Sequence, residues 1–173
     1  MPASASNYNT VPLRKGEVVG IAELGATNDP GSELVTYCLG SGLAIIVFDQ
    51  AKKIGGLLHA LLPDSSVDPV KALISPSLFV DTGIPALLQA IARLGASRAG
   101  LILKLAGGAQ FLDEKTIFNI GERNCQAAKK LLAQEGFTPQ CMDIGGKYSR
   151  NLRLEISTGR VTIQSPGSPA CFI

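Results

Sequence analysis

Two long apolar runs, separated by a short polar link, constrain the fold of this chain more than any other feature of its sequence. Residues 43–48 are nearly all aliphatic, and after D-Q-A-K-K the run at 54–62 is I-G-G-L-L-H-A-L-L. Runs of this kind predict buried β-strands, and a link this short joins antiparallel neighbours. Another strand-like run precedes them at 34–38. We therefore expect three consecutive antiparallel strands in a well-buried sheet.

Two amphipathic helices are predicted farther along the chain. The first begins at a cap formed by Asp81 or Thr82, and its apolar residues fall on one face up to Gly95. The second extends over about residues 123–135. Further strands are expected at residues 99–105, 138–144, 152–158 and 161–164, and residues 64–76 are expected to form a loop.

Strands in runs, with two helices between them, favour an α+β fold in which the helices cover a mostly antiparallel sheet. The chain has 173 residues, which is a typical length for one domain. We assign residues 1–16 to a flexible N-terminal segment, 17–165 to a single domain and 166–173 to a C-terminal tail. The polar beginning and the breaker-rich S-P-G-S-P-A stretch suggest these boundaries.

The composition predicts a folded protein without a strongly charged partner. Hydrophobic residues make up 46% of the chain and charged residues 17%, so apolar burial can offset the conformational entropy lost on folding. The net charge is +2, with scattered Lys and Arg, which argues against nucleic acid as a partner. Neither a signal peptide nor a run of about eighteen apolar residues is visible, so we expect a cytoplasmic protein without membrane insertion.

Cofactor and metal sites find little support in the sequence. The four cysteines, Cys38, Cys125, Cys141 and Cys171, are far apart, and the chain has one histidine. This pattern fits reduced thiols and lacks the local pairs of a zinc site. The glycines form neither a Walker loop nor a dinucleotide fingerprint. We therefore expect no metal and no cofactor.

Among the candidate residues, His59 is the one best suited to a catalytic role. It is flanked by leucines on a predicted strand, where it is either a satisfied core histidine or a general base with an ordinary pKa near 6.5. A base needs a nucleophile on a neighbouring strand, and Cys38 or Ser41 could supply one. The alternative for Cys38 is a small buried strand residue. A hydrolase that uses Ser41 lacks a visible carboxylate to orient His59.

Several short motifs then follow one another between about Glu17 and Ile163. They are V-T-Y-C-L-G-S-G-L-A-I-I-V-F-D, G-G-L-L-H-A-L-L-P-D-S, K-L-A-G-G-A, I-G-E-R-N, D-I-G-G-K and T-G-R-V. In order and spacing this series resembles the CheD family, bacterial chemotaxis proteins that deamidate glutamines on chemoreceptors. The resemblance implies an α/β/β sandwich related to cysteine-dependent toxin deamidases, in agreement with the layered fold expected from the sequence pattern.

The resemblance also implies a cysteine nucleophile, a histidine base and a threonine that helps to arrange the histidine. The threonine of the family pattern T-x-x-L-G-S-C corresponds to Thr36, and the histidine of G-G-x-x-H corresponds to His59. The nucleophile directly follows Leu-Gly-Ser in that pattern, and this chain has Gly42 there. Because glycine has no side-chain atom that can attack an amide carbon, we expect deamidase activity to be lost or weakened.

Three functional hypotheses follow from these observations. In the first, a CheD-like protein binds the cytoplasmic helices of chemoreceptors or a CheC-like phosphatase and acts by occupancy. In the second, the chain is an active protein-glutamine deamidase that uses Cys38 with His59. This requires a turn that brings Cys38 to the position of Gly42, because four extended residues span roughly 13 Å. In the third, the chain is a small hydrolase that uses Ser41.

Overall fold

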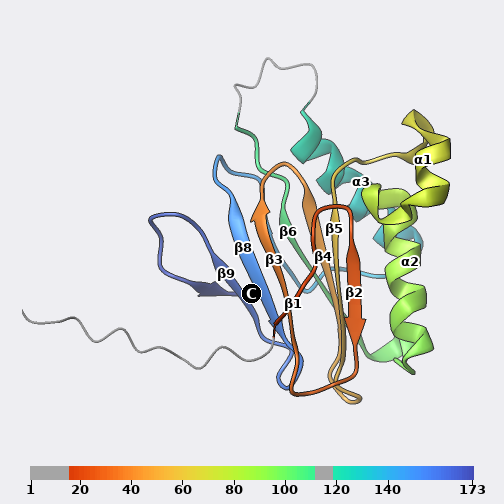
Figure 1. The fold of residues 1–173 in the computed structure, drawn as a ribbon, viewed down its shortest axis with the longest axis vertical. Helices are drawn as coiled ribbons and strands as arrows, with labels where there is room; N and C mark the ends of the chain where they lie inside the picture. Colours follow the sequence, from red (N-terminus) through yellow and green to blue (C-terminus); the bar gives the residue numbers. More distant parts are fainter. Residues whose placement is uncertain (1–15, 112–118) are drawn as a thin grey trace, which may run out of the picture.

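The computed structural model of this protein describes residues 16–111 and 119–173, so residues 1–15 of the predicted N-terminal segment lie outside the described residues. Two five-stranded sheets face each other, and helices cover the outer face of one of them (Figure 1). Sheet A has the strand order β1-β3-β8-β9-β10, and sheet B has the order β2-β5-β4-β6-β7. The predicted layered α+β architecture is confirmed.

In the described part of the chain, strands come first and last, and the helices lie between them together with β6. The strands are β1 (Gly16–Val18), β2 (Leu24–Thr27), β3 (Glu33–Leu39), β4 (Leu43–Asp49), β5 (Ile54–Ala60), β6 (Leu101–Gly107), β7 (Cys141–Ile144), β8 (Arg150–Glu155), β9 (Val161–Gln164) and β10 (Cys171–Phe172). The helices are α1 (Pro69–Ile74), α2 (Val80–Arg93) and α3 (Ile120–Gln134), with 3₁₀ turns η1 (Ser65–Val67), η2 (Pro76–Leu78) and η3 (Arg98–Gly100).

The central strands β4 and β5 are apolar on both faces because sheet B is covered on both sides. Along β4, Leu43, Ile45 and Val47 pack toward α2 and α3, whereas Ala44, Ile46 and Phe48 pack toward sheet A. On β5, Leu58 belongs to the helix layer and Leu57 to the layer between the sheets. Alternation places the side chain of His59 on the same side as Leu57, between the two sheets.

The prediction of three consecutive paired strands is wrong at its first step. Strand β4 pairs with β5 as expected, but β3 lies in sheet A, where it pairs with β1 in parallel and with β8 in antiparallel orientation. Residues 40–42 therefore carry the chain from one sheet to the other. A second parallel pair, β6 with β7, makes sheet B mixed as well. Since each sheet ladder still consists mainly of antiparallel pairs, the predicted fold class holds.

The two main helices lie within a few residues of their predicted bounds. The expected cap is wrong, because Phe79 is the N-cap of α2 and Asp81 instead accepts a hydrogen bond from the Ser65 N–H, at 3.0 Å. The predicted loop at 64–76 contains the 3₁₀ turn η1 and the helix α1, and η2 begins at its last residue. Side chains of Asp64 and Asp68 cap this segment locally, as Asp does at helix starts.

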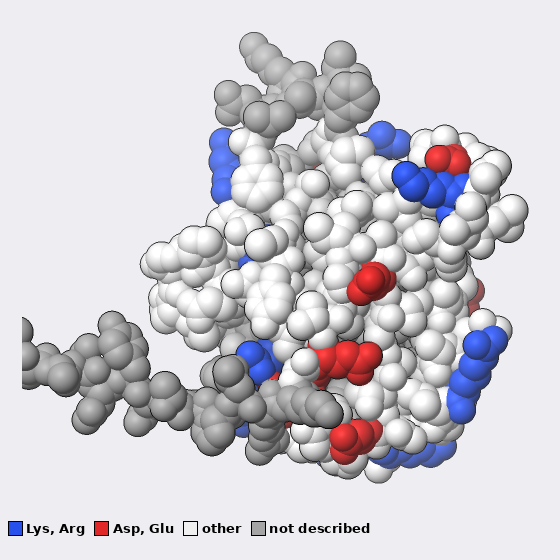
Figure 2. All heavy atoms as spheres, in the orientation of Figure 1, with Lys and Arg blue, Asp and Glu red and all other residues white. Residues whose placement is uncertain are grey.

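The surface seen in Figure 2 has dispersed charge. Lys and Arg side chains lie mostly around the rim of this face, and uncharged side chains cover much of its area. This face therefore has no continuous basic patch among the residues described. Within the same described residues, none of the helices combines the length and apolar character needed to cross a bilayer.

Candidate active site between the two sheets

A threonine and a histidine from opposite sheets meet at one end of the sandwich. Thr36 on β3 of sheet A and His59 on β5 of sheet B place Oγ1 and Nδ1 2.8 Å apart, within hydrogen-bond distance. Thr36 shares the inward face of β3 with Leu34, as the two-residue period of a strand requires, and Leu34 is part of the core between the sheets. The two residues are 23 apart in sequence and adjacent because their sheets pack face to face.

The imidazole of His59 is almost entirely removed from solvent, with 1% of the residue exposed. Burial disfavours the charged form of histidine, and it lowers the pKa of His59 from 6.5 to about 4. The imidazole is therefore neutral near pH 7. In the tautomer that carries its hydrogen on Nδ1, the ring donates to Thr36 Oγ1 and the Nε2 lone pair is left to act as a base.

Gly42 lies directly beside the free nitrogen of this imidazole. A β-carbon built on Gly42 would lie 3.0 Å from His59 Nε2 and 2.9 Å from the carbonyl oxygen of Ala60. A side chain at position 42 would thus begin next to the histidine, where a nucleophilic atom could reach its base. Because the 2.9 Å approach is to a backbone oxygen, any residue with a β-carbon, alanine and cysteine included, would need a small shift of β5 or of residues 40–42.

Cys38 is close to Thr36 in sequence but is not directed into this site. Strand β3 has a register shift between Thr36 and Leu39, and Cys38 has a positive φ of 54°. A bulge of this kind inserts an extra residue and redirects the side chains that follow it. Leu39 therefore points into the core, whereas Cys38 is exposed. The interpretation of Cys38 as a small buried strand residue is wrong.

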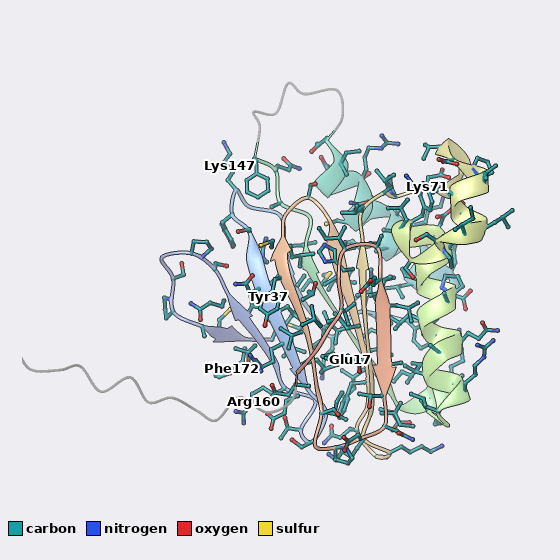
Figure 3. All side chains as sticks on the ribbon, viewed as in Figure 1. Glu17, Tyr37, Lys71, Lys147, Arg160 and Phe172 are labelled. Atoms are coloured by element: carbon teal, nitrogen blue, oxygen red, sulfur yellow. The ribbon has the colours of Figure 1, made fainter. Side chains whose placement is uncertain are left out.

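The surroundings of Cys38 are unlike those of His59. The backbone N–H of Cys38 donates to Asn151 Oδ1 on β8, at 3.0 Å. Its neighbour Tyr37 is also exposed, on the same strand (Figure 3). Among the hydrogen bonds of the described residues, the one formed by the His59 side chain is with Thr36. The structure does not bring Cys38 into a pair with His59.

Ser41 contributes its backbone rather than its hydroxyl to the described contacts. The residue is exposed, and its carbonyl oxygen accepts a hydrogen bond from Asn124 Nδ2 at 2.9 Å. Neither Asp nor Glu is hydrogen-bonded to His59 among the described residues. A Ser41–His59–carboxylate triad is therefore not assembled in this part of the chain.

Asn124 is a site neighbour that the sequence analysis did not single out. It lies in the first turns of α3, within the I-G-E-R-N motif, and is 0% exposed. A usable signal was present, because Asn124 interrupts an apolar helix face formed by Cys125, Ala128 and Leu132. A polar residue in such a face needs a hydrogen-bond partner inside the protein.

An ion pair between a buried arginine and a partly exposed aspartate also joins the two sheets close to this end. Arg150 on β8 lies opposite Leu39 in the ladder and donates to both carboxylate oxygens of Asp143 on β7, at 2.9 and 3.1 Å. Arg150 is almost fully buried. The motif D-I-G-G-K contains Asp143, but the sequence alone did not reveal its partner. This pair braces the strand next to the bulge that separates Thr36 from Leu39.

The donor set at the site suits acid–base chemistry better than metal binding. Thr36 and His59 supply one hydroxyl and one imidazole, and the described residues contain no group of three or more His, Cys, Asp or Glu side chains that could hold a metal ion. A neutral histidine held by a threonine can withdraw a proton from a nucleophile beside Nε2. The residue beside Nε2 is Gly42.

Comparisons with known proteins extend over most of this chain. The sequence model of the family described as "CheD chemotactic sensory transduction" matches residues 61–165. A probable chemoreceptor glutamine deamidase of Syntrophus aciditrophicus (strain SB) is 43% identical over 152 residues, which cover 88% of this chain and 95% of the relative. A protein of the same name from Desulforamulus reducens is 42% identical over 163 residues, which cover 91% of this chain and 96% of the relative. Another from Solibacter usitatus (strain Ellin6076) is 41% identical over 150 residues, with coverage of 87% and 89%.

Proposed function

This chain belongs to the CheD family, and we propose that it is a chemotaxis protein that binds chemoreceptors without the usual deamidation. The relatives named above are described as chemoreceptor glutamine deamidases, which supports a receptor glutamine segment as the ligand. In this proposal the cytoplasmic helices of a receptor are the main partner, and a CheC-like phosphatase is a second one. The unit that carries the function is residues 17–165, acting in the cytoplasm.

One observation carries the proposal that chemistry is impaired. The β-carbon of a residue at position 42 would be 3.0 Å from His59 Nε2, and this chain has glycine there. Thr36 and His59 keep the contact that orients a base. The site therefore has a base and the hydroxyl that orients it. It lacks the attacking atom at the neighbouring position 42.

The missing atom matters because of the reaction that a glutamine deamidase performs. A thiolate adds to the side-chain amide carbon, the tetrahedral adduct loses ammonia, and water hydrolyses the acyl-enzyme to leave glutamate. The histidine takes the thiol proton and delivers a proton to the leaving nitrogen. With Gly42, His59 can hold and transfer protons, but no covalent adduct can form at this position.

The alternative of a deamidase that uses Cys38 is less well supported. Cys38 is exposed on the outer side of a bulge, whereas His59 is buried between the sheets. Activity through Cys38 would require the bulge to rearrange and the thiol to reach the core. A hydrolase that uses Ser41 has the weaker support, because Ser41 is exposed and its carbonyl is held by Asn124.

The proposal is tested by incubating the chain with receptor cytoplasmic fragments and measuring conversion of glutamine to glutamate by mass spectrometry. We expect no conversion with the native chain and clear conversion with Gly42→Cys. Gly42→Ala is the matched control, because it adds the same β-carbon without a thiol. Binding of the native chain to the same fragments is measured in parallel by titration calorimetry.

Two further variants separate the alternatives. Conversion by the native chain that disappears in Cys38→Ala would support the Cys38 deamidase, and conversion that disappears in Ser41→Ala would support the serine hydrolase. Either result would contradict the proposed loss of activity. A native chain that fails to bind receptor fragments would contradict the proposed partner.

A further inference from the structure

Hydrogen bonds hold the backbone carbonyls of residues 40–42. The carbonyl of Gly40 accepts from the Ala109 N–H at 2.9 Å, and the carbonyl of Gly42 accepts from the Gly108 N–H at 2.7 Å. Between them, the carbonyl of Ser41 accepts from Asn124 Nδ2 at 2.9 Å. Each carbonyl of this segment is thus satisfied, and the middle one is held by a side chain rather than by the backbone.

Asn124 also reaches the segment that follows His59. Its Nδ2 donates a second hydrogen bond to the carbonyl of Leu61, at 2.9 Å. Leu61 directly follows the end of β5, which carries His59. One amide group on α3 therefore connects the residue before Gly42 with the strand that holds the base.

The hydrogen bond to Ser41 has a consequence for the N–H of Gly42. The described peptide bonds include no cis bond, and in a trans peptide the C=O and the following N–H point in opposite directions. Because the Ser41 carbonyl points toward Asn124, the Gly42 N–H points away from α3. Among the described residues it donates to no acceptor. In acyl-transfer enzymes, the N–H of the nucleophilic residue is a common donor to the oxyanion.

The position of Asn124 is costly for stability alone. Its Oδ1 is buried and has no hydrogen-bond partner among the described residues, and an unsatisfied buried polar atom is destabilising. An apolar residue at this place on α3 would fit the neighbouring Cys125, Ala128 and Leu132. A buried polar group that is left partly unsatisfied needs an explanation. Here the explanation is that Asn124 holds the carbonyls of Ser41 and Leu61.

We propose that Asn124 is a positioning residue that sets the orientation of the peptide between Ser41 and Gly42 relative to His59. It acts through the backbone, so that position 42 faces Nε2 and its N–H faces the place where substrate would bind. This inference rests on the proposed function, because it concerns the same site. It explains how the backbone at residue 42 is held in place, although glycine has no side chain that could hold it.

The test uses the full chain with Gly42→Cys as the reference and measures how the iodoacetamide reactivity of the introduced thiol depends on pH. Fragmentation mass spectrometry separates labelling at position 42 from labelling of Cys38 on the same peptide. Thiolate next to a histidine forms at lower pH than the ordinary thiol value near 8.5. We expect a lowered midpoint in the reference, and a rise of about one pH unit or more when Asn124→Leu or Asn124→Asp is added.

Asn151→Asp is the matched control in the same background, because Asn151 is exposed and its Oδ1 already serves as an acceptor for Cys38. We expect it to leave the midpoint of the introduced thiol unchanged. A midpoint that shifts with Asn124→Asp but not with Asn124→Leu would be an effect of the added charge and would overturn the inference. An unchanged midpoint in both variants would do the same.

Two remaining outcomes are also decisive. If neither Asn124 variant folds, as judged by thermal melting, Asn124 stabilises the whole domain and the positioning role is overturned. If the reference itself shows an ordinary midpoint, His59 is not poised toward position 42, and both the inference and the proposed function fail. A lowered reference midpoint that survives Asn124→Leu contradicts the role of Asn124 alone.

Discussion

Positions 38 and 42 lie on one short segment and differ in what they offer for catalysis. Cys38 provides a thiol, but it lies on a β-bulge and its side chain is exposed and directed away from the core. Gly42 provides no side chain, but a β-carbon there would touch His59 Nε2. The thiol is thus at position 38, whereas the contact with the base is at position 42.

The contrast between these positions shows that the surroundings of a residue decide whether it can be a nucleophile. A thiol needs a base within hydrogen-bond reach to form the reactive thiolate. The pair Thr36–His59 provides a base beside position 42 and is not paired with Cys38. The presence of a cysteine nearby in sequence therefore carries little weight.

The largest expected effect is a loss of deamidation when the base beside position 42 is removed. In the Gly42→Cys chain, adding His59→Gln should lower the rate of glutamine deamidation about a thousandfold, or about 4 kcal/mol, because the thiol loses its proton acceptor. The rate is measured by mass spectrometry of receptor fragments. Activity that survives His59→Gln would show that another group serves as the base.

The next effect is a pH dependence of the free energy of unfolding, which arises because His59 is buried in the native chain. Its pKa is lowered by burial to about 4, whereas the unfolded residue titrates near 6.5. As pH falls from 6.5 to 4, the unfolded state binds a proton that the folded state excludes, so the free energy of unfolding decreases. Below pH 4 both states are protonated and this loss is complete, at about 3 kcal/mol.

Urea unfolding at pH 7 and pH 4, for the native chain and for His59→Gln, measures this loss. The variant should lack this part of the decrease. The carboxyls of Asp29, Asp49 and Asp64 also have lowered pKa values through hydrogen bonds to backbone N–H groups. Their contributions are lost at lower pH and are common to both proteins. Equal losses in the two chains would mean that His59 is solvated in the fold.

Thr36→Val should produce a smaller effect on the same pair. The change removes the hydroxyl that contacts His59 Nδ1 and leaves a buried ring nitrogen unsatisfied, at a cost of about 2 kcal/mol in unfolding free energy. In the Gly42→Cys background, deamidation should fall about tenfold because the imidazole loses its orientation. Thr162→Val, on β9 of the same sheet, should change neither quantity appreciably.

The smallest expected effect belongs to Cys38. Because the side chain is exposed, Cys38→Ala should change the unfolding free energy by less than about 0.5 kcal/mol. In the Gly42→Cys background it should leave the deamidation rate within about twofold. A large loss of activity with Cys38→Ala would reverse the comparison and place the thiol in the reaction.

Much of the fold could be predicted from local patterns. The apolar runs that become β4 and β5 identified a buried antiparallel pair, and the apolar face of α2 identified a helix layer. The partner of β3 could not be predicted in this way. A short link between two strands normally joins neighbours in one sheet, whereas residues 40–42 join two sheets, and this depends on the distant strands β1 and β8.

The candidate site was predicted in part. His59 and Thr36 were identified through family motifs, and the 2.8 Å contact agrees with a pairing between them. The exposure of Cys38 was not predicted, because strand alternation places residues 36 and 38 on one face unless a bulge intervenes. Asn124 was overlooked although it interrupts an apolar helix face, and its two partner carbonyls, 63 and 83 residues away in sequence, could not be predicted.

Local patterns in the sequence predicted the layered fold class, and the resemblance to family motifs singled out Thr36, His59 and the glycine at position 42. Periodicity and motif spacing carry this information before the chain folds. The outward direction of Cys38, the proximity of Gly42 to His59 and the two contacts of Asn124 became known from the packed structure alone. Sheet packing and a bulge act between segments far apart in sequence, and they select which side chains share one small buried volume.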